Sequence, residues 1–114
     1  MITIYHNPRC SKSRQTLALL QEQGIEPEIV LYLDTPPDAD TLKSLLSKLG
    51  IGARQLLRKG EDAYKENALS NPELSDEQLI EAMTRHPKLI ERPIVIKGDK
   101  AVLGRPPENV LELI

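Results

Sequence analysis

Tryptophan, phenylalanine and any second cysteine are missing from this chain of 114 residues. Tyrosine occurs only three times, so the hydrophobic core has to be built from leucine, isoleucine and valine. No apolar run is long enough to span a bilayer, and we therefore expect no membrane segment. The single cysteine cannot form an internal disulfide, which predicts a reduced, cytoplasmic protein.

A large excess of charge of either sign is also missing. The chain has 15 Lys and Arg against 17 Asp and Glu, a net charge of −2, which argues against binding to nucleic acid or to an anionic membrane. His86 lies far in the sequence from His6 and Cys10, and these three residues lack the spacing of zinc ligands, so we expect no metal site. The length and the 39% hydrophobic content predict one folded domain over residues 1–114.

The first part of the chain predicts a strand, a helix and a second strand. The strands are expected at residues 1–5 and 28–33, where apolar and β-branched side chains gather. The helix between them is expected at residues 11–23, and Gly24 ends it. A βαβ unit of this length predicts two parallel strands joined by a right-handed crossover.

A helical block is expected at about residues 38–88. A helix over residues 40–50 has apolar side chains at helical spacing and ends at Gly50. A second helix is expected at residues 75–86. It begins with Ser75, and Gln78 follows three positions later, which is the arrangement of a capping box.

The last part of the chain predicts a hairpin and a short helix. Residues 92–104 contain two apolar runs joined by the sequence KGDK, with Gly-Asp at the centre of the turn. Pro106 and Pro107 then open a helix that continues through the sequence ENVLELI. The complete pattern predicts an α/β fold with a mixed four-stranded sheet, in the order β-α-β, helical insertion, β-β-α.

Cys10 lies at the junction of the first strand and the first helix, in the sequence HNPRCSKSR. A helix N-terminus has free N–H groups and a dipole that favour the reactive thiolate, and the same groups can bind a tetrahedral oxyanion. Arg9 and Arg14 are cations close in the sequence, and His6 can either lower the pKa of the thiol or orient the loop. The plainer alternative is that Cys10 is a small buried hydrophobic residue.

Two common cysteine motifs are incomplete in this sequence. A C-x-x-C pair would need a second cysteine where Ser13 stands, so the chain cannot close its own disulfide. A C-x5-R phosphatase loop would need an arginine where Thr16 stands, and Arg14 comes two positions too early. We expect the Ser13 hydroxyl to cap the helix that follows, or to donate weakly to the thiolate.

Four separated segments together resemble a known family. They are YHNPRCSKSRQTL, LLRKGEDAYKE, ERPIVI and GRPPENVLELI. In these segments the chain resembles the ArsC family of glutaredoxin-coupled arsenate reductases, which implies a thioredoxin-like fold. The resemblance implies a catalytic Cys10 with His6 close to it, and substrate binding by the arginines Arg58, Arg92 and Arg105. The residues expected to support the site are Asn7, Ser13, Arg14 and Pro93, of which Pro93 would be the cis-proline of the fold.

The resemblance also implies a reaction and its partners. Cys10 would attack arsenate, glutathione would then reduce the arsenic, and glutaredoxin would clear the mixed disulfide left on Cys10. Glutathione would be a co-substrate, and no bound cofactor is expected. Arg92 and Arg105 stand at the two ends of the predicted hairpin and can converge on one pocket, whereas Arg58 would come from the helical block.

Two other functions stay open from the sequence. One is a regulatory interaction protein of the Spx type, which shares the fold and typically senses redox state through a C-x-x-C pair. Ser13 and the three retained arginines favour an enzyme over this alternative. The other is a thiol oxidoreductase that acts on a different substrate, for which the same thiolate and arginines would serve. Nothing in the sequence requires more than a monomer.

Overall fold

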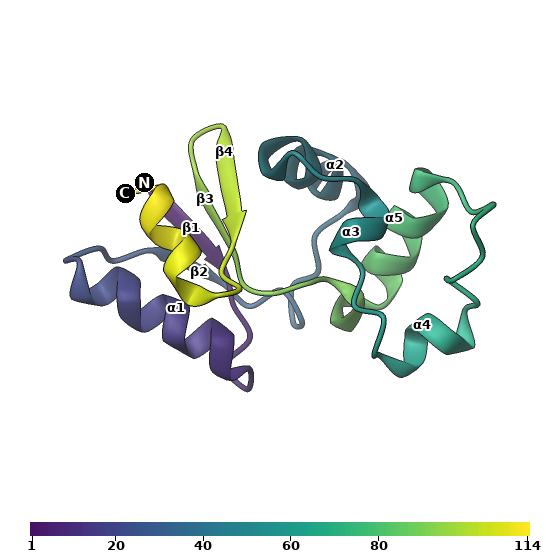
Figure 1. Ribbon diagram of the computed structural model, residues 1–114, viewed down its shortest axis with the longest axis horizontal. Coiled ribbons are helices and arrows are strands. Elements are labelled where there is room, and N and C mark those ends of the chain that lie inside the picture. The colour runs from purple at the N-terminus through teal and green to yellow at the C-terminus, as the bar shows by residue number, and fades with distance from the viewer. The chain divides into compact units, whose positions relative to one another are not determined.

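The computed structural model describes all residues from 1 to 114. The chain forms two compact units, one of residues 1–35 and 92–114 and the other of residues 36–91. The first unit contains the whole β-sheet, and the second is helical (Figure 1). Each unit has its own buried residues.

The first unit is a four-stranded sheet with helices packed on it. The strand order is β2-β1-β3-β4, with β1 parallel to β2 and antiparallel to β3, and with β3 antiparallel to β4. This arrangement confirms the predicted mixed four-stranded sheet. The elements are β1 (Ile2–Tyr5), α1 (Ser11–Glu22), β2 (Glu28–Val30), β3 (Ile94–Lys97), β4 (Lys100–Leu103) and the 3₁₀ helix η2 (Pro107–Glu112).

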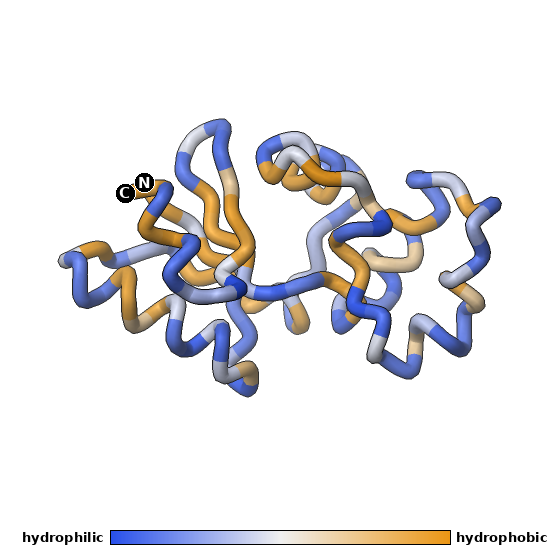
Figure 2. The backbone as a smooth tube through the Cα atoms, in the orientation of Figure 1, coloured by the Kyte–Doolittle hydropathy of each residue, from blue (hydrophilic) through white to orange (hydrophobic).

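An aliphatic cluster fixes α1 and η2 on the sheet. Side chains alternate across a strand, so Ile2 and Ile4 of β1 lie on one face of the sheet and are buried there. Leu20 of α1, Val95 of β3 and Val110 of η2 complete the cluster, and α1 and η2 also contact each other. In Figure 2 the central strands have mostly apolar colouring, whereas α1 alternates between polar and apolar residues. The start of α1 is therefore held at a fixed place at the end of β1.

The second unit is built from short helices. They pack on buried leucine, isoleucine and methionine side chains. None of the helices in the chain combines the length and the apolar character that a membrane span needs. Ser75 and Gln78 form the predicted capping box at the start of α5, with each side chain accepting from the other's backbone N–H. The elements are α2 (Ala39–Leu49), α3 (Ala53–Leu56), α4 (Asp62–Glu66), α5 (Asp76–Arg85) and the 3₁₀ helix η1 (Pro87–Leu89).

Two elements differ from the sequence-based prediction. Strand β2 ends at Val30 instead of residue 33, because the N–H groups of Asp34 and Thr35 turn back to the carbonyl of Leu31. The predicted C-terminal helix is a 3₁₀ helix, in which Asn109 N–H bonds to the carbonyl three residues earlier. The Asn109 side chain also donates to the carbonyl of Leu103 at the end of β4 and to that of Arg105 in the loop that follows, which holds this tighter turn in place.

Truncating Leu20 tests the aliphatic cluster. Because its side chain is 0% exposed, we expect Leu20→Ala to lower the free energy of unfolding by about 2–5 kcal/mol in urea denaturation. Leu111→Ala is the control, since Leu111 is 42% exposed, and roughly 0.5 kcal/mol or less is expected there. Equal losses in the two variants would contradict this description of the core.

Candidate active site

The loop that carries Cys10 is organised by Asn7. The Asn7 carbonyl accepts from Cys10 N–H at 3.0 Å, and its side-chain oxygen accepts from Arg9 N–H at 3.0 Å. Cys10 is the N-cap residue of α1, and no side chain forms a capping hydrogen bond at this end of the helix. The N–H groups of the first turn are therefore left for the sulfur or for a bound anion.

Several donors stabilise the thiolate of Cys10, which is half-buried. Partial burial by itself would raise the pKa of the thiol. Hydrogen bonds from the Ser13 N–H, the Arg92 side chain and the Lys12 N–H, together with the positive charge of Arg92, outweigh this effect and lower the pKa below its ordinary value. The thiol is thus activated for nucleophilic attack, and the alternative of an inert, buried cysteine does not fit these surroundings.

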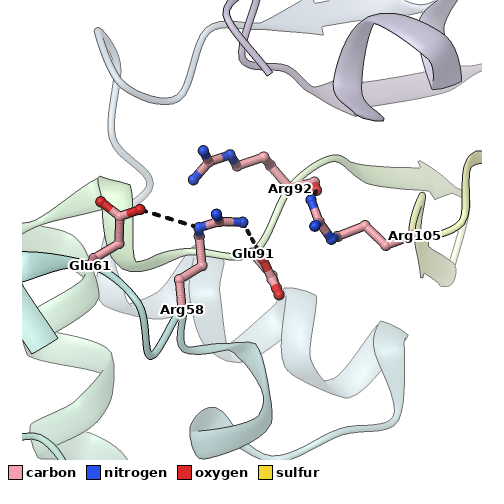
Figure 3. A network of polar contacts seen from close by, with 5 residues as sticks. All are labelled: Arg58, Glu61, Glu91, Arg92 and Arg105. Atoms are coloured by element: carbon pink, nitrogen blue, oxygen red, sulfur yellow. Dashed lines mark hydrogen bonds and ion pairs between the residues drawn. The ribbon is translucent and has the colours of Figure 1, made fainter. Parts of the chain in front are cut away.

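Arg92 and Arg105 lie at the base of the β3–β4 hairpin. At the open end of the hairpin, next to the last paired residues of β3 and β4, Gly104 N–H donates to the Pro93 carbonyl at 2.9 Å. Arg105 donates to the carbonyl of Arg92 at 3.4 Å, so the two residues are linked directly (Figure 3). The Nε of Arg92 is buried and has no hydrogen-bond partner within the protein. A buried, unpaired guanidinium N–H beside a thiolate suits an oxyanion substrate.

Pro93 separates Arg92 from strand β3 and is buried. The Arg92–Pro93 peptide bond is cis, and so is the Arg105–Pro106 bond. Both arginines at the base of the hairpin therefore precede a cis-proline.

His6 and Ser13 form a buried pair behind the cysteine loop. His6 Nδ1 lies 2.6 Å from Ser13 Oγ, which also accepts from the Asn7 N–H at 3.0 Å. The Ser13 hydroxyl is thus turned inward and does not cap α1, contrary to expectation. Burial, and then the charge of Arg14, lower the pKa of His6 below 6.5, so its ring favours the neutral form. This geometry favours the loop-holding role of His6 over a direct charge on the thiolate.

The two cations closest to Cys10 in the sequence have other contacts. Arg14 donates to the Pro8 carbonyl at 2.9 Å and closes the loop from outside. Arg9 is exposed. The cation that stabilises the thiolate is instead Arg92, which is brought to the sulfur by the fold and is distant in the sequence.

Arg58 belongs to the helical unit and is held by two carboxylates. It follows an isolated antiparallel bridge between Leu57 and Ile90. Its guanidinium lies 2.6 Å from Glu91 and 3.5 Å from Glu61, and all three side chains are about a quarter exposed (Figure 3). Sequence reasoning did not find Glu61 or Glu91, although the spacing of three residues between Arg58 and Glu61 is a weak signal for such a pair.

The potential metal ligands of the chain are dispersed. No group of three or more His, Cys, Asp and Glu side chains is placed to hold an ion.

Comparison with known proteins decides the family. The ArsC family matches residues 5–113 of the chain. The chain belongs to the ArsC family. Its four-stranded sheet and cysteine-bearing first helix are the thioredoxin-like arrangement expected for an ArsC protein.

Relatives of this ArsC protein match it over nearly their whole length. The protein YfgD of Escherichia coli K12, named as uncharacterized, is 60% identical over 99% of this chain and 96% of its own. An arsenate reductase of Neisseria meningitidis serogroup B is 54% identical over 96% of this chain and 94% of its own. The solved structure of an arsenate reductase from Vibrio cholerae matches with a TM-score of 0.97 and 53% identity, over 99% of this chain and 97% of that one.

Replacing Arg92 tests which cation activates the thiol. We expect Arg92→Gln to raise the pKa of Cys10, because the substitution removes both a hydrogen bond and a positive charge from the thiolate. The rate of alkylation by iodoacetamide, followed against pH, measures this pKa. Arg9→Gln is the matched control, since Arg9 is exposed and adjacent in the sequence. A larger shift in Arg9→Gln than in Arg92→Gln would overturn the assignment.

The buried His6 makes stability depend on pH. Its pKa in the folded state is below the unfolded value of 6.5, so the unfolded chain binds a proton first as the pH falls. The stability that is present above pH 6.5 should therefore be lost as the pH falls through the folded-state pKa. We expect urea denaturation of His6→Asn to show a smaller loss between about pH 7 and pH 5. His86→Asn controls for the removal of a histidine elsewhere, and equal pH dependence in wild type and His6→Asn would refute the argument.

Proposed function

We propose that this protein is an arsenate reductase that uses glutathione and glutaredoxin as its reductants. The observation that carries the proposal is the activated thiol of Cys10 beside the buried, unpaired Nε of Arg92. A nucleophile and an oxyanion-binding cation thus occupy the same place. Close relatives that are named arsenate reductase support the choice of arsenate among the possible oxyanions.

Arsenate binding needs dispersed positive charge, because arsenate is largely a dianion near neutral pH. The planar guanidinium of arginine gives paired, charge-assisted hydrogen bonds to such tetrahedral anions. In this proposal Arg92 and Arg105 bind arsenate from the hairpin, beside the N–H groups in the first turn of α1 that stabilise the thiolate. The family resemblance implies Arg58 as a third arginine for the substrate, and in the structure this side chain is paired with Glu61 and Glu91.

The first chemical step is attack of the Cys10 thiolate on arsenic. A sulfur–arsenic bond forms, and one arsenate oxygen leaves as water after it accepts protons. Arsenic remains pentavalent in this adduct. The role of Arg92 changes during the step, since the negative charge that it stabilises moves from the sulfur to the arsenate oxygens.

The second step transfers two electrons to arsenic. A glutathione thiolate attacks the Cys10 sulfur, a sulfur–sulfur bond forms, and the pair of electrons from the sulfur–arsenic bond stays with arsenic. Arsenic leaves as trivalent arsenite, and Cys10 remains as a mixed disulfide with glutathione. Because the chain has no second cysteine, a thiol from another molecule has to reduce this disulfide, and we assign that role to glutaredoxin. Because these reductants belong to the reducing cytoplasm, we propose that the protein acts there.

A coupled assay tests the proposed function. NADPH oxidation is followed with glutathione, glutathione reductase and glutaredoxin present, with and without arsenate. We expect turnover that depends on arsenate in the wild type and is abolished in Cys10→Ser, because serine is not ionised near neutral pH. Arg92→Lys, Arg105→Lys and Arg58→Lys should each lower kcat/KM by roughly 10- to 100-fold, the effect of losing one charge-assisted hydrogen bond.

Arg85→Lys is the control for the arginine series. Arg85 is exposed and paired with Glu81 on the surface of α5, so its replacement should leave kcat/KM unchanged. The result that would reject arsenate as the substrate is a rate of NADPH oxidation that does not rise when arsenate is added, in a folded protein whose Cys10 still alkylates rapidly. That result would favour a thiol oxidoreductase with a different substrate.

A further inference from the structure

The buried face of α1 is polar near the N-terminus of the helix and apolar further along. Ser13, Thr16 and Leu20 are its buried residues, at the helical spacing of three and four. Leu20 belongs to the aliphatic core, and Ser13 contacts His6 behind the thiol. Thr16 lies between them, is 0% exposed, and belongs neither to the core cluster nor to the cysteine loop. A polar side chain completely buried in this position needs an explanation.

The Thr16 side chain is fixed in one orientation. Its hydroxyl donates to the Lys12 carbonyl one turn earlier, at 2.8 Å. A longer contact of 3.4 Å runs from the same oxygen to the carbonyl of Gly104, at the end of the β3–β4 hairpin. The short hydrogen bond locks the rotamer, so the hydroxyl and the methyl group form a rigid surface facing Gly104.

Gly104 is packed too closely to carry a side chain. A Cβ atom at this position would lie 2.7 Å from Cγ of Pro93 and 3.0 Å from Cγ2 of Thr16, and closer still to the Thr16 hydroxyl. Its backbone needs no left-handed conformation, so glycine is required here for space and not for flexibility. The backbone at Gly104 therefore lies directly on the Thr16 side chain.

Both arginines of the hairpin are next to this contact in the chain. Gly104 N–H donates to the Pro93 carbonyl, so these two residues continue the pairing of β3 with β4 by one position. Arg92 immediately precedes this step and Arg105 immediately follows it. Arg105 in turn donates to the Arg92 carbonyl. Any displacement of Gly104 from α1 would move the two guanidiniums away from the N-terminus of the helix.

We infer that Thr16 and Gly104 form a positioning contact, which sets the separation between the thiol-bearing end of α1 and the two arginines that bind the substrate. Both are positioning residues, which act through the hairpin and the helix. The inference rests on the proposed function for its substrate, but the geometry concerns the thiol and the arginines directly. A shift of even 1 Å in such a contact changes the alignment of nucleophile and cation.

A double-mutant cycle tests the contact. We expect Gly104→Ala to push the hairpin away from α1, to raise the pKa of Cys10 in iodoacetamide alkylation, and to raise KM for arsenate on the order of tenfold. Thr16→Ala removes the hydroxyl and the methyl group that the new Cβ would meet. In Thr16→Ala/Gly104→Ala the contacts of the new Cβ with Thr16 are removed and only its contact with Cγ of Pro93 remains, so the pKa of Cys10 and KM should return in part toward the wild-type values.

Gly60→Ala is the matched control, because no atom lies within 4 Å of a Cβ built at Gly60. Urea denaturation of each variant measures stability separately. A merely structural role predicts that Gly104→Ala loses stability while the folded protein keeps the wild-type thiol pKa and KM, and this result would overturn the inference. Equal defects in Gly104→Ala and in the double variant would overturn it as well. Alkylation needs no arsenate, so a failure of the proposed function leaves this test intact.

Discussion

A half-buried sulfur anion has to be kept next to positive charge, and most of the first unit serves this requirement. Burial alone would favour the neutral thiol, so the fold supplies N–H donors from the start of α1 and a guanidinium from Arg92. These groups come from opposite ends of the chain. The sheet order β2-β1-β3-β4 joins them, because it places the strand after Arg92 directly beside the strand before Cys10.

The local features of the fold could be predicted from the sequence. The strand–helix junction at Cys10, the capping box of α5 and the hairpin turn depend on residues only a few positions apart, and their spacing is visible in one dimension. The mixed sheet followed from the order of these elements. The C-terminal element was harder, because two prolines and the side-chain bonds of Asn109 decide between an α-helix and a 3₁₀ helix.

The partners within the site could not be predicted from spacing. Arg9 and Arg14 are the cations nearest to the thiol in the sequence, but the fold gives that role to Arg92. The inward turn of Ser13 depends on His6 being buried behind it, and the two carboxylates on Arg58 depend on how the helical unit closes. Each of these contacts joins residues from different elements, where tertiary packing overrides local preference. The family resemblance pointed to the arginines, but it did not indicate what holds them.

The buried hydrogen bond between Ser13 and His6 bears on the timing of the reaction. Position 13 is where a dithiol protein would keep its second sulfur, and here the side chain faces away from Cys10 into the protein. Without a second cysteine the chain cannot reduce an oxidised Cys10 by itself. In the proposed reaction each cycle would therefore depend on thiols from solution. Turnover in the proposed reaction would then follow the thiol concentration of the compartment, and the protein would slow by itself whenever that supply runs low.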